Sequence, residues 1–180
     1  MKLPIGLRNH VNRARDVGRK LAGRHNVDLH LVDLSVAAHD LARALNGDML
    51  LAEARRLGLN ITPLEHDVPI LLHGPVAAMW LEGDGNLYDD SILEAVRWHT
   101  TGVAGMSKIA KVVFLADKLD PQKVSSYSFL RKVESLAKTS VDEALLEYLD
   151  RVIESHLAKR LLVHPASLGL RNELVSALGP

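Results

Sequence analysis

The chain has 180 residues, of which 47% are hydrophobic and 24% charged, and its formal net charge is zero. This length predicts a single domain with a sizeable core, the zero net charge argues against a nucleic-acid partner, and the absence of cysteine excludes disulfides and thiolate metal sites. No apolar run approaches the roughly 18 residues of a membrane span, and residues 1–13 lack the apolar stretch of a signal peptide, so we expect a cytoplasmic protein with no membrane partner.

Hydrophobic residues recur with helical spacing almost throughout the chain, and no alternating stretch predicts a strand. A first helix is predicted at about residues 7–23, and it places His10 on the core-facing stripe, because steps of three and four residues return to one face of a helix. The stretch 29–45 is apolar almost all round, which is typical of a helix in the centre of a domain. It contains the adjacent pair His39-Asp40, which is costly to bury unless both side chains have partners.

The middle of the chain predicts shorter elements. Asp48 is predicted to cap a third helix, and the segment 59–72, which contains two prolines, is predicted to be a connection. A short helix is then predicted to start within residues 72–75, where Pro75 suits the first helical position and His73 lies at the entry to the helix. Residues 83–86 are predicted to form a turn.

Two further helices direct ionisable side chains inward. Ser91 and Glu94 have the spacing of a capping box, and the helix that begins there places His99 on its apolar stripe. Ser107 is predicted to cap the next helix, in which Asp117 shares a face with apolar residues.

The last third of the chain also predicts helices. Pro121 is expected to end the preceding helix, and a helix near residues 125–137 is expected to follow. A second capping box at residues 140–143 begins a long amphipathic helix to about Leu162, and Pro165 begins the last helix. The predicted fold class is therefore all-α, a helical bundle in one domain.

Six ionisable side chains thus point into the core or lie at its edge. Their imidazole nitrogens and carboxylate oxygens, without sulfur, suit first-row metals such as iron or manganese better than zinc. Six protein ligands exceed what one catalytic ion takes while it keeps open positions, so two divalent ions that share a bridging carboxylate and hydroxide fit better. The six candidate ligands are His10, His39, Asp40, His73, His99 and Asp117.

A single histidine on an apolar stripe more often has a structural role than a ligand role. His156 lies on such a stripe, and we interpret it as structural because nothing near it in the sequence resembles a second ligand. The grouping of the six candidates, and the residues around them, carry the metal hypothesis.

Longer motifs surround the candidate ligands. Residues 71–76 read Leu-Leu-His-Gly-Pro-Val, residues 97–102 read Arg-Trp-His-Thr-Thr-Gly, residues 105–107 read Gly-Met-Ser, and residues 115–117 read Leu-Ala-Asp. Together with the spaced His10, His39-Asp40 and Asp117, these motifs resemble the HD-domain metal-dependent phosphohydrolases. Within that family they are similar to the YqeK branch, the symmetrical bis(5′-nucleosyl)-tetraphosphatases, from about Arg8 to Pro121.

The resemblance implies an all-α HD fold in a single domain over residues 1–180, with a metal-binding core at about 8–121 and C-terminal helices at about 122–180. It implies a di-iron centre and hydrolysis of diadenosine tetraphosphate into two ADP molecules by attack of a metal-bridging hydroxide. The substrate class would be a dinucleoside polyphosphate.

The resemblance also carries the ligand role to each of the six candidates. Asp40 adjoins His39 and is the best candidate to bridge the two ions. One ion would be held by His10, His39 and Asp117, and the other by His73 and His99.

Substrate contacts are predicted close to the ligands in the sequence. Arg43 and Lys118 are the preferred phosphate contacts, with a catalytic role assigned to Asp40 and Arg43. The motif Thr100-Thr101-Gly102 is also predicted to contact the substrate.

The chain departs from the family pattern in three places. The family usually has lysine where this chain has Arg43, often has Arg-Pro at positions 103–104, here Val-Ala, and often has Gly-Arg at positions 122–123, here Gln-Lys. Arginine and lysine bind phosphate with different geometry, so these changes alter the expected substrate contacts.

Two alternatives remain open. One is an HD phosphohydrolase that acts on another nucleotide, such as a nucleoside mono- or triphosphate or a guanosine alarmone. The other is a non-catalytic helical module that binds a nucleotide or a protein. A homodimer is compatible with either.

Overall fold

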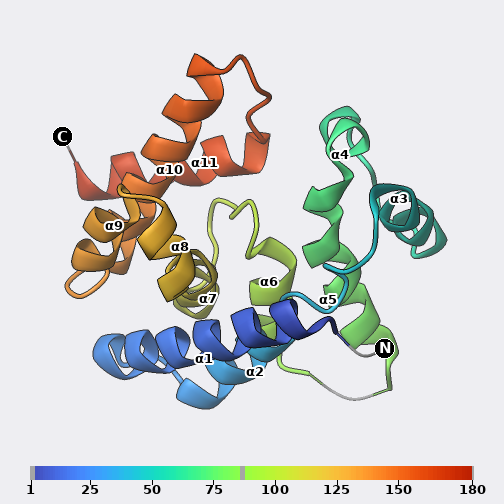
Figure 1. Cartoon of the computed structure of the whole chain (residues 1–180), viewed down its shortest axis with the longest axis horizontal. Helices are drawn as coiled ribbons and strands as arrows, with labels where there is room; N and C mark the ends of the chain where they lie inside the picture. Colours follow the sequence, from blue (N-terminus) through green and yellow to red (C-terminus); the bar gives the residue numbers. More distant parts are fainter. Residues whose placement is uncertain (1–2, 86–87, 180) are drawn as a thin grey trace.

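The computed structural model describes residues 3–85 and 88–179, and within them the chain forms helices and no strand, which confirms the all-α prediction (Figure 1). Among these described residues, no helix is both long and apolar enough to cross a membrane. The helices are α1 (Ile5–His25), α2 (Leu29–Ala38), α3 (Gly47–Arg56), α4 (Pro63–Asp67), the 3-10 helix η1 (Pro69–Leu72), α5 (His73–Gly83), α6 (Asp90–Trp98), α7 (Lys108–Lys118), α8 (Pro121–Ser126), α9 (Leu130–Leu136), α10 (Val141–Ala158) and α11 (Pro165–Leu178).

The helix predicted over residues 29–45 ends early. α2 ends at Ala38, and the chain continues through tight turns in which the backbone N–H of Leu41 bonds to the carbonyl of Ala38 and that of Arg43 to the carbonyl of Asp40. These bonds span three residues instead of four, so the backbone is wound more tightly than an α-helix. His39-Asp40 therefore lies in a turn after α2, and its prediction inside a helix was wrong.

Several predicted helix starts were also wrong. Asn46, and not Asp48, caps α3 by accepting from the N–H of Met49. Asp89 caps α6 by accepting from the N–H of Ser91, so the capping box expected from Ser91 is absent. α5 begins at His73, within the predicted start at residues 72–75, but Pro75 is its third residue and not its first.

The caps at Ser107 and Ser140 and the start of α11 at Pro165 are confirmed. In the expected connection 59–72, Thr62 forms a capping box with Glu65 and begins α4, and η1 follows.

Later boundaries differ as well. The helix expected at 125–137 is two helices, α8 and α9, and Pro121 begins α8. α10 ends at Ala158, before the expected Leu162, and Arg160 then adopts a φ of +55°. Of the turn predicted at 83–86, residue 86 lies outside the described residues.

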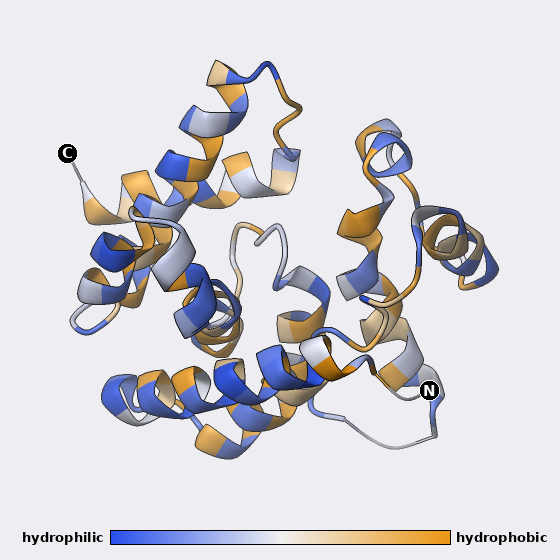
Figure 2. Ribbon diagram, in the orientation of Figure 1, coloured by the Kyte–Doolittle hydropathy of each residue, from blue (hydrophilic) through white to orange (hydrophobic). Residues whose placement is uncertain are grey.

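The buried apolar residues form two clusters. The first joins α1, α2, α7, α9, α10 and α11 around Phe114, and the second joins α3, α5 and α6 around Leu50. α6 contributes Ala95 to the first cluster and Val96 to the second, so it links them. Hydrophilic and hydrophobic residues alternate along α1 (Figure 2), as expected of a helix with one buried face.

Gly74 allows α5 to approach the end of α6 closely. A Cβ atom at this position would lie 2.8 Å from the carbonyl oxygen of Arg97 and 2.9 Å from that of Val96. Backbone atoms cannot move aside as a flexible side chain can, so only glycine fits without a shift of one helix. This contact places His73, the neighbour of Gly74, beside His99, which follows α6.

We predict that Gly74→Ala moves α5 away from α6. Overpacking of this kind costs about 1–3 kcal/mol, so thermal unfolding should occur about 5 °C lower. The matched control is Gly83→Ala in the same helix, where an added Cβ meets nothing within 4 Å and stability should stay the same or rise slightly. Equal unfolding temperatures for the two variants would contradict this role of Gly74.

Candidate metal centre

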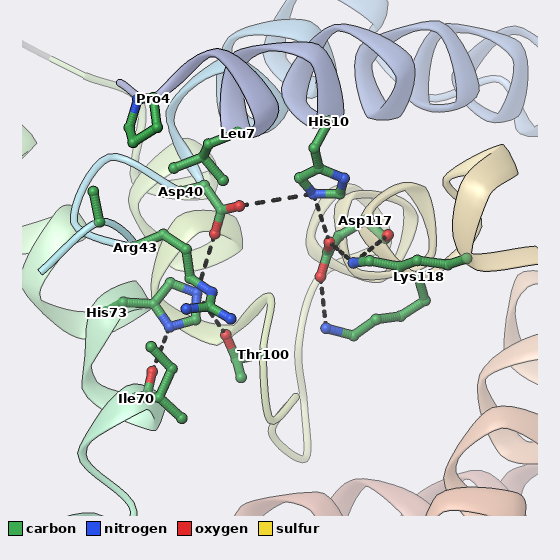
Figure 3. A pocket seen from close by; sticks show the side chains of 12 residues that line it. Pro4, Leu7, His10, Asp40, Arg43, Ile70, His73, Thr100, Asp117 and Lys118 are labelled. Carbon is green, nitrogen blue, oxygen red and sulfur yellow. Dashed lines mark hydrogen bonds and ion pairs between the residues drawn. The ribbon is translucent and has the colours of Figure 1, made fainter. Parts of the chain in front are cut away.

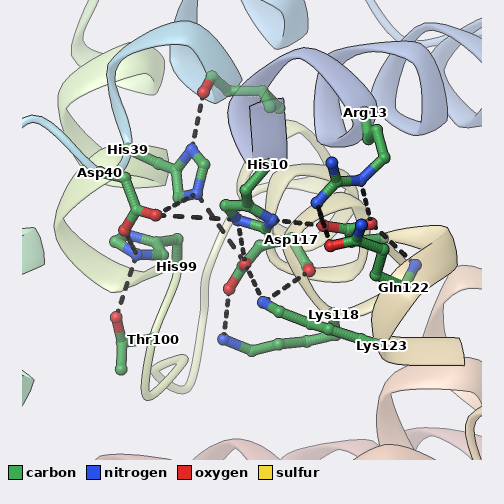
Figure 4. A network of polar contacts seen from close by, with 12 residues as sticks. His10, Arg13, His39, Asp40, His99, Thr100, Asp117, Lys118, Gln122 and Lys123 are labelled. Carbon is green, nitrogen blue, oxygen red and sulfur yellow. Dashed lines mark hydrogen bonds and ion pairs between the residues drawn. The ribbon is translucent and has the colours of Figure 1, made fainter. Parts of the chain in front are cut away.

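The fold brings all six predicted ligands together, although they come from five separate parts of the chain (Figures 3 and 4). One is in the middle of α1, two follow α2, one begins α5, one follows α6, and one is in the last turn of α7. Five of the six are thus at helix ends, where the backbone can turn side chains toward one point. These residues are His10, His39, Asp40, His73, His99 and Asp117.

The Nδ1 atoms of three histidines are fixed by backbone carbonyls. His39 donates to the carbonyl of Val36 at 2.6 Å, and His99 donates to the carbonyl of Val96 at 2.8 Å. His73 makes the same contact with the carbonyl three residues before it. A carbonyl oxygen only accepts, so Nδ1 must carry the hydrogen, and in a neutral ring Nε2 is left with a lone pair.

The fourth histidine is fixed by a carboxylate. Nδ1 of His10 lies 2.6 Å from Oδ2 of Asp120, so the Nε2 atom of His10 also points into the centre. Metal-bound histidines commonly use their second nitrogen in this way, which fixes both tautomer and ring orientation.

The Nε2 atoms and carboxylate oxygens lie close together. Nε2 of His73 is 2.9 Å from Nε2 of His99 and 3.2 Å from Oδ1 of Asp40. On the other side, Nε2 of His39 is 3.4 Å from Oδ2 of Asp40, and Nε2 of His10 is 3.0 Å from Oδ1 of Asp117. The two oxygens of Asp40 therefore face different pairs of histidines.

One unpaired atom supports a cation as the partner of this donor set. His39 is fully buried, and its Nε2 has no hydrogen-bond partner among the described residues. An unpaired polar atom in the interior is costly, and structures rarely tolerate one. Nitrogen and oxygen donors of this kind match divalent first-row metals, so these residues fit a metal centre.

Both carboxylates stay ionised. Burial raises the pKa of Asp40, but contacts with His39 and His73 outweigh it and hold the pKa well below its usual range. Burial likewise raises the pKa of Asp117, and Lys118, His10 and Lys123 reverse that effect. The centre therefore presents two anionic ligands throughout the neutral pH range.

The buried histidines respond differently to their surroundings. Burial, together with His39 and His73, holds the pKa of His99 well below its usual value, which keeps its ring neutral. Burial lowers the pKa of His39, but Asp40 and Asp117 raise it by more. Positive charge is therefore favoured at the point where His39 meets the two carboxylates.

Asp120 lies directly behind the candidate centre, and the sequence interpretation missed it. It is 1% exposed and accepts from His10, while Arg13 donates to both of its oxygens at 2.7 and 2.8 Å. Burial raises its pKa, and the hydrogen bonds from Arg13 and His10 lower it to about 2. An aspartate directly before Pro121 is a suitable helix N-cap, and Asp120 does cap α8. Its position in the sequence therefore gave no indication that it also contacts His10.

The predicted substrate contacts differ in position. Arg43, Thr100 and Lys118 line a cavity of about 540 Å³ together with four of the six ligands (Figure 3). The hydroxyl of Thr100 lies 3.1 Å from Nε2 of His99. Arg43 is exposed, and its guanidinium makes no hydrogen bond or ion pair with any described residue, so its charge is available.

Thr101 and Gly102 do not line that cavity. The carbonyl of Thr101 accepts from Ser167. Gly102 has a φ of +66°, and a Cβ at this position would clash with the side chain of Leu170. Packing against α11 thus explains Gly102, and its substrate role stays a prediction.

Comparison with known proteins places this centre in a class. Residues 7–122 match the HD domain, which is more than half of the chain, and the chain belongs to the HD-domain family. The fold and the resemblance noted from the motifs are thereby confirmed.

Two relatives and one solved structure have more specific descriptions than the HD domain. The chain is 28% identical over 157 residues to the symmetrical bis(5′-nucleosyl)-tetraphosphatase of Bacillus subtilis, with 87% of this chain and 83% of that protein covered. It is 27% identical to the enzyme of the same name from Staphylococcus aureus, over 95% of this chain and 88% of that one. A crystal structure of a predicted HD superfamily hydrolase involved in NAD metabolism from Clostridium acetobutylicum superposes with a TM-score of 0.88 at 25% identity, covering 94% of this chain and 88% of the other.

We predict that Asp120→Asn weakens metal binding about 10- to 100-fold, because loss of a partner of this kind lets the ligand ring turn and reduces its basicity. Titration of metal-free protein with Fe²⁺ or Mn²⁺ measures this directly. Asp28→Asn is the matched control, since Asp28 caps α2 away from the centre and asparagine caps equally well. Unchanged metal affinity in Asp120→Asn would rule out this role.

Proposed function

We propose that this protein is a metal-dependent hydrolase that cleaves diadenosine tetraphosphate symmetrically into two ADP molecules. The observation that carries the proposal is the convergence of four histidine Nε2 atoms on two ionised aspartates, with one of the four, in His39, lacking a hydrogen-bond partner in the described part of the chain. The names of the relatives from Bacillus subtilis and Staphylococcus aureus support the substrate and the cleavage position.

The proposed cofactor is a pair of divalent ions, iron in preference to manganese. His10, His39 and Asp117 form one group of donors that could hold an ion. Asp40 and His99 form a second group, which also includes His39. His73 lies against this second group, so the proposed division, with Asp40 between the ions, agrees with these distances.

Two bound ions would supply a water of lowered pKa and would polarise the phosphoryl oxygens. The protein's own residues supply binding and orientation. Arg43 at the mouth of the cavity and Lys118 in its wall would bind phosphate oxygens, and the hydroxyl of Thr100 is placed to hydrogen-bond to one.

The charges of the centre suit a polyphosphate. The positive and negative charges of the side chains around the centre nearly cancel. Two divalent cations would therefore leave an excess of positive charge, and a tetraphosphate chain would neutralise it. The carboxylates are Asp40, Asp117 and Asp120, and the cations are Arg13, Arg43, Lys118 and Lys123.

Another nucleotide is the second candidate substrate. The Clostridium acetobutylicum structure is described as a hydrolase involved in NAD metabolism, which is a different nucleotide chemistry. A panel of dinucleoside polyphosphates, nucleoside mono- and triphosphates and dinucleotides with defined metals separates these substrates. No turnover of any member and no bound metal would favour the non-catalytic module.

The first prediction concerns the products. Metal-loaded protein incubated with diadenosine tetraphosphate should yield ADP alone, because symmetrical cleavage breaks the central anhydride. Chromatography of the products at short times measures this. AMP and ATP in equal amounts would contradict symmetrical cleavage.

The second prediction concerns Asp40. Asp40→Ala removes the carboxylate whose oxygens face both sides of the centre, so activity should fall to background and fewer than two metal ions should remain per chain. Circular dichroism should still show a helical fold. Asp16→Ala is the control, since Asp16 is exposed on α1 and its side chain is paired with Arg19 at the surface. Retained turnover in Asp40→Ala after metal removal and reloading would overturn the site assignment.

A further inference from the structure

A second cavity adjoins the metal centre. It has a volume of about 640 Å³, and its lining residues come from the end of α7, from α8, from the α8–α9 connection and from α9 and α10 and the residues after it. Figure 1 shows where these elements lie. Lys118 and Lys123 line both this cavity and the one that contains the ligands, so the two spaces meet at these lysines. We call the second cavity the α10 groove. Its size is within the range of cavities that bind small molecules.

Positive charge marks the point where the groove begins. Nζ of Lys118 lies 2.6 Å from Oδ2 of Asp117, and Nζ of Lys123 lies 2.5 Å from Oδ1 of the same carboxylate (Figure 4). If Asp117 binds a metal ion, its charge is shared with that ion, and both ammonium groups can then bind another anion. A phosphate chain that leaves the centre on this side would pass between them.

Aromatic rings line the groove beyond the lysines. Tyr127 and Phe129 have ring centroids 6.4 Å apart, and Phe129 and Tyr148 have centroids 6.2 Å apart. Tyr127 is 59% exposed, in the connection between α8 and α9. An exposed tyrosine ring beside lysines is suited to stacking a nucleobase, because every base presents a flat π face.

Tyr148 supplies a polar group at the same place. Its ring packs edge-on against Phe114 at 5.4 Å, which fixes its position. Tyr148 is partly buried, and its hydroxyl makes no hydrogen bond with any described residue. Burial raises the pKa of Tyr148, so the hydroxyl stays protonated. It can therefore donate a hydrogen bond to a ring nitrogen of the base or to a ribose oxygen.

We propose that the α10 groove binds one nucleoside of a dinucleoside polyphosphate, with Lys118 and Lys123 on the phosphates at its opening and Tyr127 against the base. This inference rests on the proposed function, because it needs a substrate with phosphates at the metal centre. It assigns a specificity role to residues outside the family motifs noted in the sequence.

A third cavity, of about 450 Å³, also adjoins the centre, at Thr100. It is lined mainly by apolar residues such as Leu64, Val68 and Leu71. Arg160 and Tyr148 also line it, but none of the described lysines does. The α10 groove differs from it in having Lys118 and Lys123 where it meets the metal centre and the exposed ring of Tyr127 beyond them, so we assign the nucleoside there.

The test compares Tyr127→Ala with wild-type protein. Loss of one stacked base should raise the KM for diadenosine tetraphosphate about tenfold and leave kcat within about twofold. Hydrolysis of inorganic tripolyphosphate, which has no base, should be unchanged relative to the wild type. Tyr148→Phe keeps the packing and removes the donor, so it should raise the same KM severalfold. Leu29→Ala, which removes an exposed apolar side chain from α2 outside the groove, is the control and should change neither value.

Binding of ADP, measured by calorimetry, separates failure of this inference from failure of the proposed function. If wild-type protein does not hydrolyse the dinucleotide but binds ADP more tightly than Tyr127→Ala does, the groove stands and the proposed function fails. If wild-type protein hydrolyses it and Tyr127→Ala has unchanged KM and unchanged ADP affinity, the groove assignment is wrong. Val68→Trp places a large side chain in the third cavity. If this variant has a raised KM and Tyr127→Ala has an unchanged KM, the base binds in the third cavity and the groove assignment is wrong.

Discussion

The hydrogen bonds that fix the four Nδ1 atoms are the constraint on which the rest of the site depends. Backbone carbonyls three residues earlier hold His39, His73 and His99, and Asp120 holds His10. Each bond determines which nitrogen carries the hydrogen and leaves the opposite nitrogen with a lone pair in the centre. The ligand set is thus oriented by the fold itself, with helix ends supplying the acceptors, and metal binding would need little rearrangement of these rings.

This orientation depends on the close packing of the helices that carry the ligands. α7 packs against α1, α2, α6 and α10, so Asp117 is held among elements of the first apolar cluster. α5 and α6 meet at Gly74, which places His73 against His99 from the second cluster. The polar centre thus receives side chains from helices of both apolar clusters. Asp40 lies between the two groups of histidines, with one oxygen toward each.

Helical periodicity was enough to predict which side chains face inward, because His99 and Asp117 lie on the apolar stripes of their own helices. Helix boundaries were less predictable. The stretch 29–45 is apolar almost all round, so nothing in its pattern marks the tight turn at His39. Asp89 and Ser91 are both suitable N-cap residues for α6, and the backbone geometry, which the sequence does not show, determines that Asp89 is the cap. Asp120 could not be found from its neighbours, because its partners His10 and Arg13 are more than 100 residues away in the chain.

The central claim is that four Nε2 atoms and two aspartates form one two-metal centre with Asp40 between the ions. Anomalous diffraction from crystals of iron-loaded protein tests it most directly. The account predicts two iron peaks, histidine ligation only through Nε2, the Nδ1 bonds intact, and one oxygen of Asp40 toward each ion. A single ion, ligation through Nδ1, or an Asp40 side chain turned away from the metal would contradict it.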